Sequence, residues 1–187
     1  MSGGFRRVNG ELTATFDVDE VRVLRSLAGE IIELIRNDAP EPASKAPDDS
    51  LAALIGSLGS TEPPEDAVLA RLFPSAYTDD EEAAGEFRRF TEQGLRDGKV
   101  ANAQTVLDSL GDPDFSDQVT ITLDDDEAQA WLRTLTDLRL ALGTRLGVEQ
   151  GDEEKWERLP PESPRRQVYI VYSWLGYLQE TLVHQLW

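Results

Sequence analysis

The 187-residue sequence contains no cysteine and a single histidine, His184. The absence of cysteine excludes a disulfide framework, a thiolate zinc site and a cysteine nucleophile. One histidine excludes metal centres built from several imidazoles, and no GxGxxG or GxxxxGK[ST] phosphate loop occurs. No stretch approaches the roughly 18 apolar residues of a membrane span, and no apolar run follows Arg6 and Arg7 as it would in a signal peptide. We therefore expect a cytoplasmic protein without membrane contact.

Positive charge is also scarce, since 18 Lys and Arg stand against 36 Asp and Glu, for a net charge of −18. Affinity for nucleic acid comes chiefly from Lys and Arg that neutralise phosphates, so we expect no direct binding to DNA. The acidic excess favours solubility and a basic protein surface as partner. The length and the 40% hydrophobic residues predict one domain with one core over residues 1–187.

The N-terminal residues have the pattern of a β-hairpin followed by a helix. Asn9-Gly10 is a strong hairpin-turn signal, because both central residues of that turn need positive φ. Asp17 is a good N-cap, and Glu20 stands three residues later as in a capping box, which predicts a helix over residues 18–36. The hairpin over residues 5–16 would bury one apolar face, made of Phe5, Leu12, Ala14 and Phe16.

Proline, glycine and charge divide the rest of the chain. Residues 37–50 and 149–164 combine proline with acidic residues, which predicts flexible loops. Gly94 and Gly98 predict a kink or break in the helical stretch 79–110, and alternation predicts a strand over residues 119–123. Pro64 is expected to begin the helix at residue 65. Further helices are expected over residues 50–58, 65–73, 124–147 and from residue 164 onward.

A short internal repeat suggests how these elements assemble. Residues 13–20 (TATFDVDE) match residues 120–127 (TITLDDDE), and each copy reads as a strand, an Asp cap and an amphipathic helix. We expect both strands to join one small antiparallel sheet. The predicted fold is mainly α with a small antiparallel β-sheet (α+β), with about five to seven helices packed around and over a three-stranded sheet.

The candidate catalytic and metal-binding residues have simpler structural interpretations. The acidic runs 79–82 and 124–127 stand at predicted helix starts, where negative charge favours the helix dipole. Counted from Asp124, a calcium loop would need Gly and Glu where Gln129 and Leu135 stand. A carboxylate pair for glycoside hydrolysis remains open, although nothing singles one out. We expect no catalytic residue, cofactor or metal, and therefore no enzyme.

The final helix is dense in aromatic residues, and three arginine doublets, Arg6-Arg7, Arg88-Arg89 and Arg165-Arg166, are the only concentrations of positive charge. Ile170, Trp174 and Tyr177 are predicted to widen its apolar face. Core packing explains most of these aromatics, and any surplus would anchor a partner. The arginines would form a basic patch only if they converge, and separate solvated side chains are the simpler interpretation. The candidate partner-binding residues are Arg6, Arg7, Arg165, Arg166, Tyr169, Trp174 and Tyr177.

Four groups of residues, in the same order along nearly the whole chain, carry a resemblance. They are residues 5–7 (FRR), 62–66 (EPPED) with 69–74 (LARLFP), 130–131 (AW) with 137–143 (DLRLALG), and 172–175 (YSWL) with 178–180 (LQE). In these residues the chain resembles the actinomycete oxidative-stress regulator (AosR) family, formerly a domain of unknown function. The resemblance implies a transcription regulator that works with an alternative sigma factor at RNA polymerase. It also implies redox sensing by two cysteines separated by three residues, which this cysteine-free chain cannot perform.

Two hypotheses about function result. The first is a non-enzymatic transcription regulator that contacts a sigma factor or RNA polymerase and lacks the cysteine switch of the family. The alternative is a protein-binding module or homodimer that is unrelated to transcription and uses the aromatic final helix.

Overall fold

A three-stranded antiparallel sheet forms at the N-terminal end of the fold in the computed structural model, which describes residues 3–38, 64–75, 80–112 and 118–187. Strands β1 (Arg6–Val8) and β2 (Glu11–Asp17) are joined by Asn9 and Gly10, whose φ values of 54° and 90° are those of the predicted turn. Strand β3 (Gln118–Leu123) pairs with β2, so the strand order is β1-β2-β3. The predicted small antiparallel sheet is confirmed.

The two copies of the internal repeat, residues 13–20 and 120–127, are related by a local twofold symmetry in the structure. Equivalent positions of the two copies are 107 residues apart, and the equivalent residues Ala14 and Ile121 pair directly across β2 and β3. Each strand leads into a helix through a complete capping box, Asp17 with Glu20 before α1 (Val18–Asn37) and Asp124 with Glu127 before α5 (Asp125–Leu146). Strands β2 and β3 therefore lead, through matching caps, into helices α1 and α5.

The cap of α5 supports a prediction about stability. Asp124 Oδ1 accepts the Glu127 N–H at 2.8 Å, and Glu127 Oε2 accepts the Asp124 N–H at 2.9 Å. We expect Asp124→Ala to lower the free energy of unfolding by about 1 kcal/mol, because it leaves helix N–H groups without an acceptor. Chemical denaturation would measure the change. Asp125→Ala, one residue inside the same helix, is the control, and an equal loss in both variants would contradict the role of the cap.

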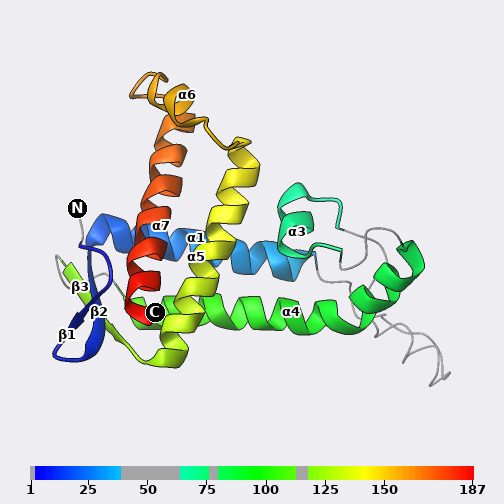
Figure 1. Cartoon of the computed structure of the whole chain (residues 1–187), viewed down its shortest axis with the longest axis horizontal. Helices are drawn as coiled ribbons and strands as arrows, with labels where there is room; N and C mark the ends of the chain where they lie inside the picture. The colour runs from blue at the N-terminus through cyan, green and yellow to red at the C-terminus, as the bar shows by residue number, and fades with distance from the viewer. Residues whose placement is uncertain (1–2, 39–63, 76–79, 113–117) are drawn as a thin grey trace.

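The helices lie in two crossed layers (Figure 1). Helices α1 and α4 (Glu81–Leu110) run side by side, and the antiparallel hairpin of α5 and α7 (Pro164–Leu186) crosses them. Two short helices complete the described fold: α3 (Ala67–Leu72) packs on α5, and α6 (Glu153–Glu157) closes the far end of the hairpin. This arrangement confirms the α+β prediction.

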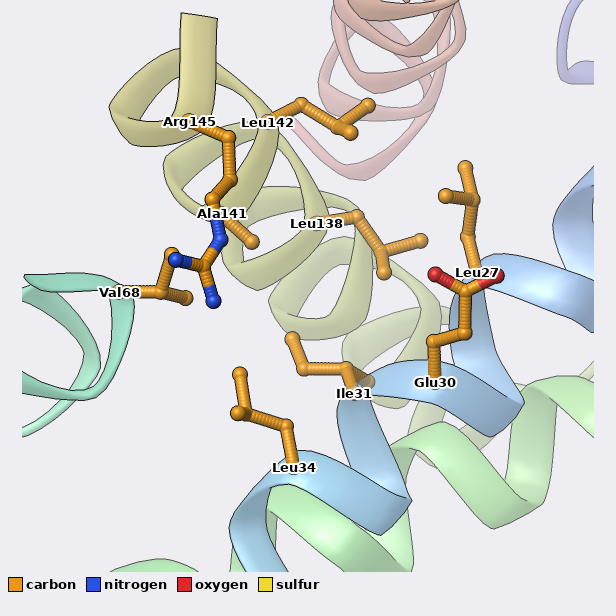
Figure 2. A pocket seen from close by; sticks show the side chains of 9 residues that line it. All are labelled: Leu27, Glu30, Ile31, Leu34, Val68, Leu138, Ala141, Leu142 and Arg145. Atoms are coloured by element: carbon orange, nitrogen blue, oxygen red, sulfur yellow. The ribbon is translucent and has the colours of Figure 1, made fainter. Parts of the chain in front are cut away.

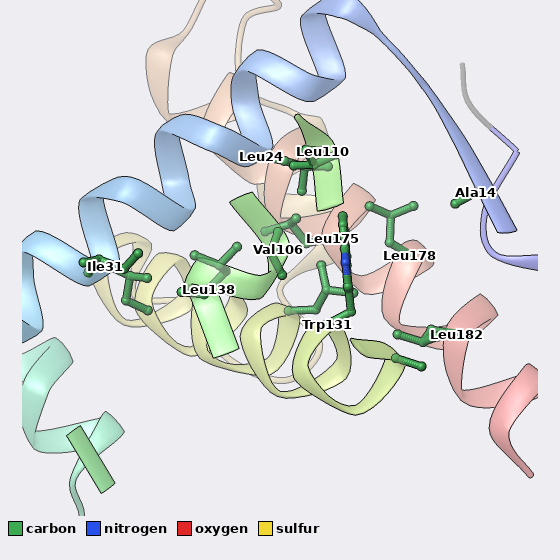
Figure 3. Packing of buried hydrophobic residues seen from close by; sticks show 14 of the residues in the cluster. Ala14, Leu24, Ile31, Val106, Leu110, Trp131, Leu138, Leu175, Leu178 and Leu182 are labelled. Atoms are coloured by element: carbon green, nitrogen blue, oxygen red, sulfur yellow. The ribbon is translucent and has the colours of Figure 1, made fainter. Parts of the chain in front are cut away.

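The core lies where the sheet meets α1, α4, α5 and α7 (Figure 3). Trp131 of α5 is at its centre, stacked on Phe16 at 5.8 Å between ring centroids and in edge contact with Phe5 at 5.4 Å. The predicted apolar face of the hairpin is buried in full. The inner face of α7 adds three fully buried leucines, Leu175, Leu178 and Leu182.

A predicted break in one helix and two other predicted element limits are wrong. Helix α4 is continuous through Gly94 and Gly98, because its packing on α1 and the i,i+4 pairs Glu92–Arg96 and Gln93–Asp97 hold the helix together there. Residues 149–164 contain α6, which forms because Trp156 is buried against Tyr169. Helix α3 begins at Ala67, with Asp66 as its N-cap, rather than at Pro64. The predicted helix 50–58 lies outside the described residues, as does the predicted loop 37–50 beyond residue 38.

Asp66 also joins α3 to α5. This contact predicts that the stability of the fold depends on pH. Its Oδ2 accepts a bond from Arg145 Nη2 at 2.9 Å. Partial desolvation raises the pKa of the Asp66 carboxyl, but the bonds from Arg145 and from the Val68 and Leu69 N–H groups outweigh it and lower the pKa below 3.8. The stabilisation is therefore present above pH 3.8 and is lost as the pH falls through the lower, folded-state value.

Asp66→Asn keeps a good N-cap and removes the charge. We expect it to lower the free energy of unfolding by less than about 1 kcal/mol at pH 7, since Arg145 is largely exposed. Denaturation of both proteins between pH 7 and pH 2.5 should show the difference shrinking toward acid. A difference that grows toward acid would contradict the sign of this pKa shift.

A candidate protein-binding face on the α5–α7 hairpin

One side of α7 points away from the core and carries exposed apolar side chains. Ile170, Ser173, Tyr177 and Glu180 follow each other at spacings of three and four residues, which places them on one side of the helix. We call these four residues the outer face. Ile170 is 57% exposed and Tyr177 is 46% exposed, against full burial of Leu175 and Leu178 on the opposite side. The prediction that Ile170 and Tyr177 widen the buried face is therefore wrong.

A groove of about 520 Å³ runs along the outer face between α7 and α5. Gly176 forms part of its lining, and a Cβ atom there would lie 3.3 Å from the Arg139 guanidinium carbon. Gly143 of α5 approaches Tyr172 in the same way, at 3.3 Å. The two glycines let the helices pack closely.

Arg139 supplies the positive charge of the groove. Its Nη1 donates to Gln179 Oε1 at 2.7 Å, and its guanidinium lies 5.1 Å from the centroid of the Tyr172 ring. Within the described residues no carboxylate lies within 4.0 Å of this guanidinium, and its Nε is buried without an acceptor. Arg139 is therefore held by neutral partners, and its charge is available to a group that enters the groove.

The remaining predicted aromatic residues of α7 have structural roles. Tyr169 is stacked between Trp156 and Tyr172, at 5.2 and 5.9 Å between centroids. Trp174 is half-buried against the core. The Tyr177 hydroxyl accepts the Gly4 N–H at 3.2 Å, which fixes its ring at the edge of the groove. Of the predicted aromatics, Tyr177 alone lines the groove.

Two of the three arginine doublets, Arg6-Arg7 and Arg165-Arg166, lie near opposite ends of α7. Arg7 donates to the Gln185 carbonyl at 3.3 Å, near the last turn. Arg165 and Arg166 belong to the first turn, where they donate to the carbonyls of Leu146 and Leu159 at 2.9 and 2.7 Å. A helix rises 1.5 Å per residue, so the doublets stand about 30 Å apart. Arg6 is exposed on β1. The four residues form no common patch.

Arg139 and Gly176 were not among the predicted site residues. Gly176 was detectable in principle, because a glycine in the middle of an aromatic-rich helix requires a reason such as close approach of a neighbour. Which side chain approaches it depends on the α5–α7 register, which the pattern of either helix alone does not contain.

The buried charges elsewhere are arranged as ion pairs. Arg96 contacts Glu92 and Asp38, each at 2.7 Å, and its guanidinium lies 4.6 Å from the Phe73 ring centroid. Lys99 contacts Asp137 at 2.6 Å. Burial raises the pKa of the Asp137 carboxyl, and the bond from Lys99 offsets this only in part. These pairs join α4 to α1 and to α5, and so explain the buried charge as structure.

The described ranges contain neither a metal-ligand cluster nor a membrane-spanning helix. No three His, Cys, Asp or Glu side chains gather there as a metal site would require. None of the helices in those ranges has the length and apolar character needed to cross a membrane.

Comparison with known proteins gives matches along almost the entire chain. The sequence model described as "Domain of unknown function (DUF2017)" matches residues 1–186. The putative oxidative stress regulator AosR of Mycobacterium leprae (strain TN) is 34% identical over 178 residues, which cover 88% of this chain and 77% of that protein. The oxidative stress regulators AosR of Mycobacterium tuberculosis (strain ATCC 25618 / H37Rv) and Mycobacterium bovis (strain ATCC BAA-935 / AF2122/97) are 33% identical over the same coverage. No solved structure matches.

Proposed function

Because the chain belongs to the DUF2017 family, together with the oxidative stress regulators AosR, we propose that it is a non-enzymatic transcription regulator that acts by protein contact with a sigma factor or RNA polymerase. The names of the relatives support a regulatory role. The contact with the transcription machinery is what the family resemblance implies. The chain carries out this role without a cysteine switch, since it has no cysteine.

The observation that carries the proposal is the exposed outer face beside the groove. Half-exposed Tyr177 lines the groove and Ile170 lies beside it on the same side of α7, and the groove contains Arg139, which has no carboxylate partner among the described residues. Aromatic and aliphatic side chains around a few fixed polar groups are typical of the centre of a protein interface. Arg139 offers the partner one fixed hydrogen-bond donor, while the net charge of −18 favours a partner whose surface is basic overall and disfavours direct binding to DNA phosphates.

The test is binding of the purified chain to core RNA polymerase and to purified sigma factors of its own source organism, at physiological salt. The variant Ile170→Lys/Val183→Lys removes two exposed apolar contacts on and beside the groove and adds charge that repels a basic partner. We expect binding at least about tenfold weaker than that of the natural chain. Val8→Lys/Leu95→Lys makes the same change at two exposed positions on β1 and α4, and should bind normally.

Two results would contradict the proposal. Absence of binding to the polymerase and to every sigma factor would remove the transcription role, and self-association detected in the same samples would then favour the homodimer. Tight, saturable binding to duplex DNA by the chain alone would contradict the indirect route.

A further inference from the structure

A second hollow lies on the other side of α5, between α1, α3 and α5 (Figure 2). It has a volume of about 210 Å³ and is lined by seven aliphatic side chains, among them Leu27, Ile31, Val68, Leu138 and Ala141. Val68, Ile31 and Leu138 are themselves buried. The hollow therefore has firm apolar walls on three helices, and it is separate from the outer face of α7.

The small side chain of Ala141 and the position of α3 keep the hollow open. In Figure 2 the Ala141 methyl group points toward the space between Val68 and Leu138. Helix α3, which carries Val68, is held to α5 by the pair of Asp66 with Arg145. A longer side chain at position 141 would fill the space that these contacts leave.

Two charged residues, Glu30 and Arg145, lie at the edge of the hollow, and only one of them is neutralised. Arg145 Nη2 is paired with Asp66 Oδ2 at 2.9 Å. Glu30 is exposed on α1 and accepts a hydrogen bond from Ser26 Oγ at 2.9 Å, while no Lys or Arg of the described residues lies within 4.0 Å of its carboxylate. The edge therefore carries one uncompensated negative charge, on a chain whose net charge is −18.

From this arrangement we propose that the hollow between α1, α3 and α5 binds a small amine with an apolar body, whose ammonium group pairs with Glu30. Seven of the nine lining side chains are aliphatic and offer no hydrogen bond, and the other two are Glu30 and Arg145, so the part of the ligand that lies against the aliphatic walls must be hydrocarbon. An engineered apolar cavity of about 150 Å³ in another protein holds benzene, so a single aromatic ring or branched alkyl group fits here. A carboxylate would be repelled by Glu30 and by the net charge, and Arg145 is already engaged.

The experiment compares three probes of nearly equal shape. These are 2-phenylethylamine, the neutral 2-phenylethanol and the anionic 3-phenylpropionate, each titrated into the full chain and followed by amide chemical shifts. We expect the amine to bind most tightly and the carboxylate least, with the largest shifts at residues that line the hollow. Glu30→Gln should weaken the amine roughly threefold, as for a solvent-accessible ion pair, and leave the alcohol unchanged. Glu33→Gln, an exposed neighbour on the same helix, is the control.

A second variant tests the location of the site. Ala141→Leu should abolish binding of the amine and the alcohol, and Ala101→Leu on the exposed side of α4 should not. The proposal is overturned if no probe binds, if the carboxylate binds as well as the amine, or if Ala141→Leu leaves binding unchanged. Failure of this site leaves the proposed contact with the polymerase intact, because the outer face shares no residue with the hollow.

Discussion

Replacing Trp131 by alanine is expected to lower the free energy of unfolding by about 3–5 kcal/mol, the range measured for large aromatic side chains in protein cores. Trp131 is fully buried, stacked on Phe16, and in edge contact with Phe5. Its removal would leave a cavity at the junction of the sheet with α5. The surrounding side chains come from several elements, so they cannot collapse into the space without moving the sheet.

Trp131→Phe separates packing from hydrogen bonding. The Trp131 Nε1 donates to Ser109 Oγ at 2.9 Å, and phenylalanine would lose this bond while it keeps most of the stacking area. We expect this variant to lose less than half of what alanine loses. Urea denaturation followed by circular dichroism would measure both variants. A midpoint for Trp131→Ala equal to that of the natural chain would show that this packing is wrong.

Glu92→Ala is expected to cost about 3 kcal/mol, because it removes the anion that stands between two buried cations. Arg88 Nε lies 3.3 Å from Glu92 Oε2, and Arg96 Nη2 lies 2.7 Å from Glu92 Oε1. Both arginines are more than nine-tenths buried. The expected loss is at the low end for a broken buried pair, since Arg96 keeps its contacts with Asp38 and the Ile35 carbonyl.

The control for Glu92 is Glu86→Ala, which removes the same charge from an exposed position of the same helix. We expect it to change the free energy of unfolding by no more than about 0.5 kcal/mol. Measurement at 0.1 M and 1 M NaCl adds a second criterion, since salt screens exposed charges far more than buried ones. Equal effects of the two substitutions, or a Glu92 effect that disappears at high salt, would contradict the buried network.

The local chemistry of the fold was predictable from the sequence. The Asn9-Gly10 turn, both capping boxes and the pairing of the two strands of the internal repeat depend on neighbouring residues, and each follows from side-chain size or hydrogen-bonding capacity. The continuity of α4 was not predictable in this way. Glycine propensity disfavours a helix at Gly94 and Gly98, but packing against α1 and the Glu92–Arg96 pair outweigh it.

The candidate face depended on information that a single helix does not contain. The sequence identifies the aromatic residues of α7, but it places Ile170 and Tyr177 on the wrong side of the helix because their chemistry alone does not say which neighbour covers them. The groove requires Arg139 to lie against Gly176, and these residues come from helices joined by a long connection. Similarly, the sequence around Trp156 predicts an acidic loop, because the residue that buries this side chain, Tyr169, belongs to the next helix and not to the local sequence.

The contacts of residues 4–7, in and just before β1, with α7 constrain how the chain folds during its synthesis. The N–H groups of Gly4 and Phe5 bond to Tyr177 and Thr181, and Arg7 bonds to the Gln185 carbonyl. A ribosome that adds 5–20 residues per second needs roughly 10–35 s to advance from the first partners to the second. Until α5 has been made, Phe5 and Phe16 lack the Trp131 ring that packs on them, and until α7 has been made the Phe5 N–H lacks its acceptor, so the nascent hairpin presents apolar surface that a ribosome-associated chaperone can bind. The N-terminal strands are thus made first but reach their final packing only after α7 has been synthesised.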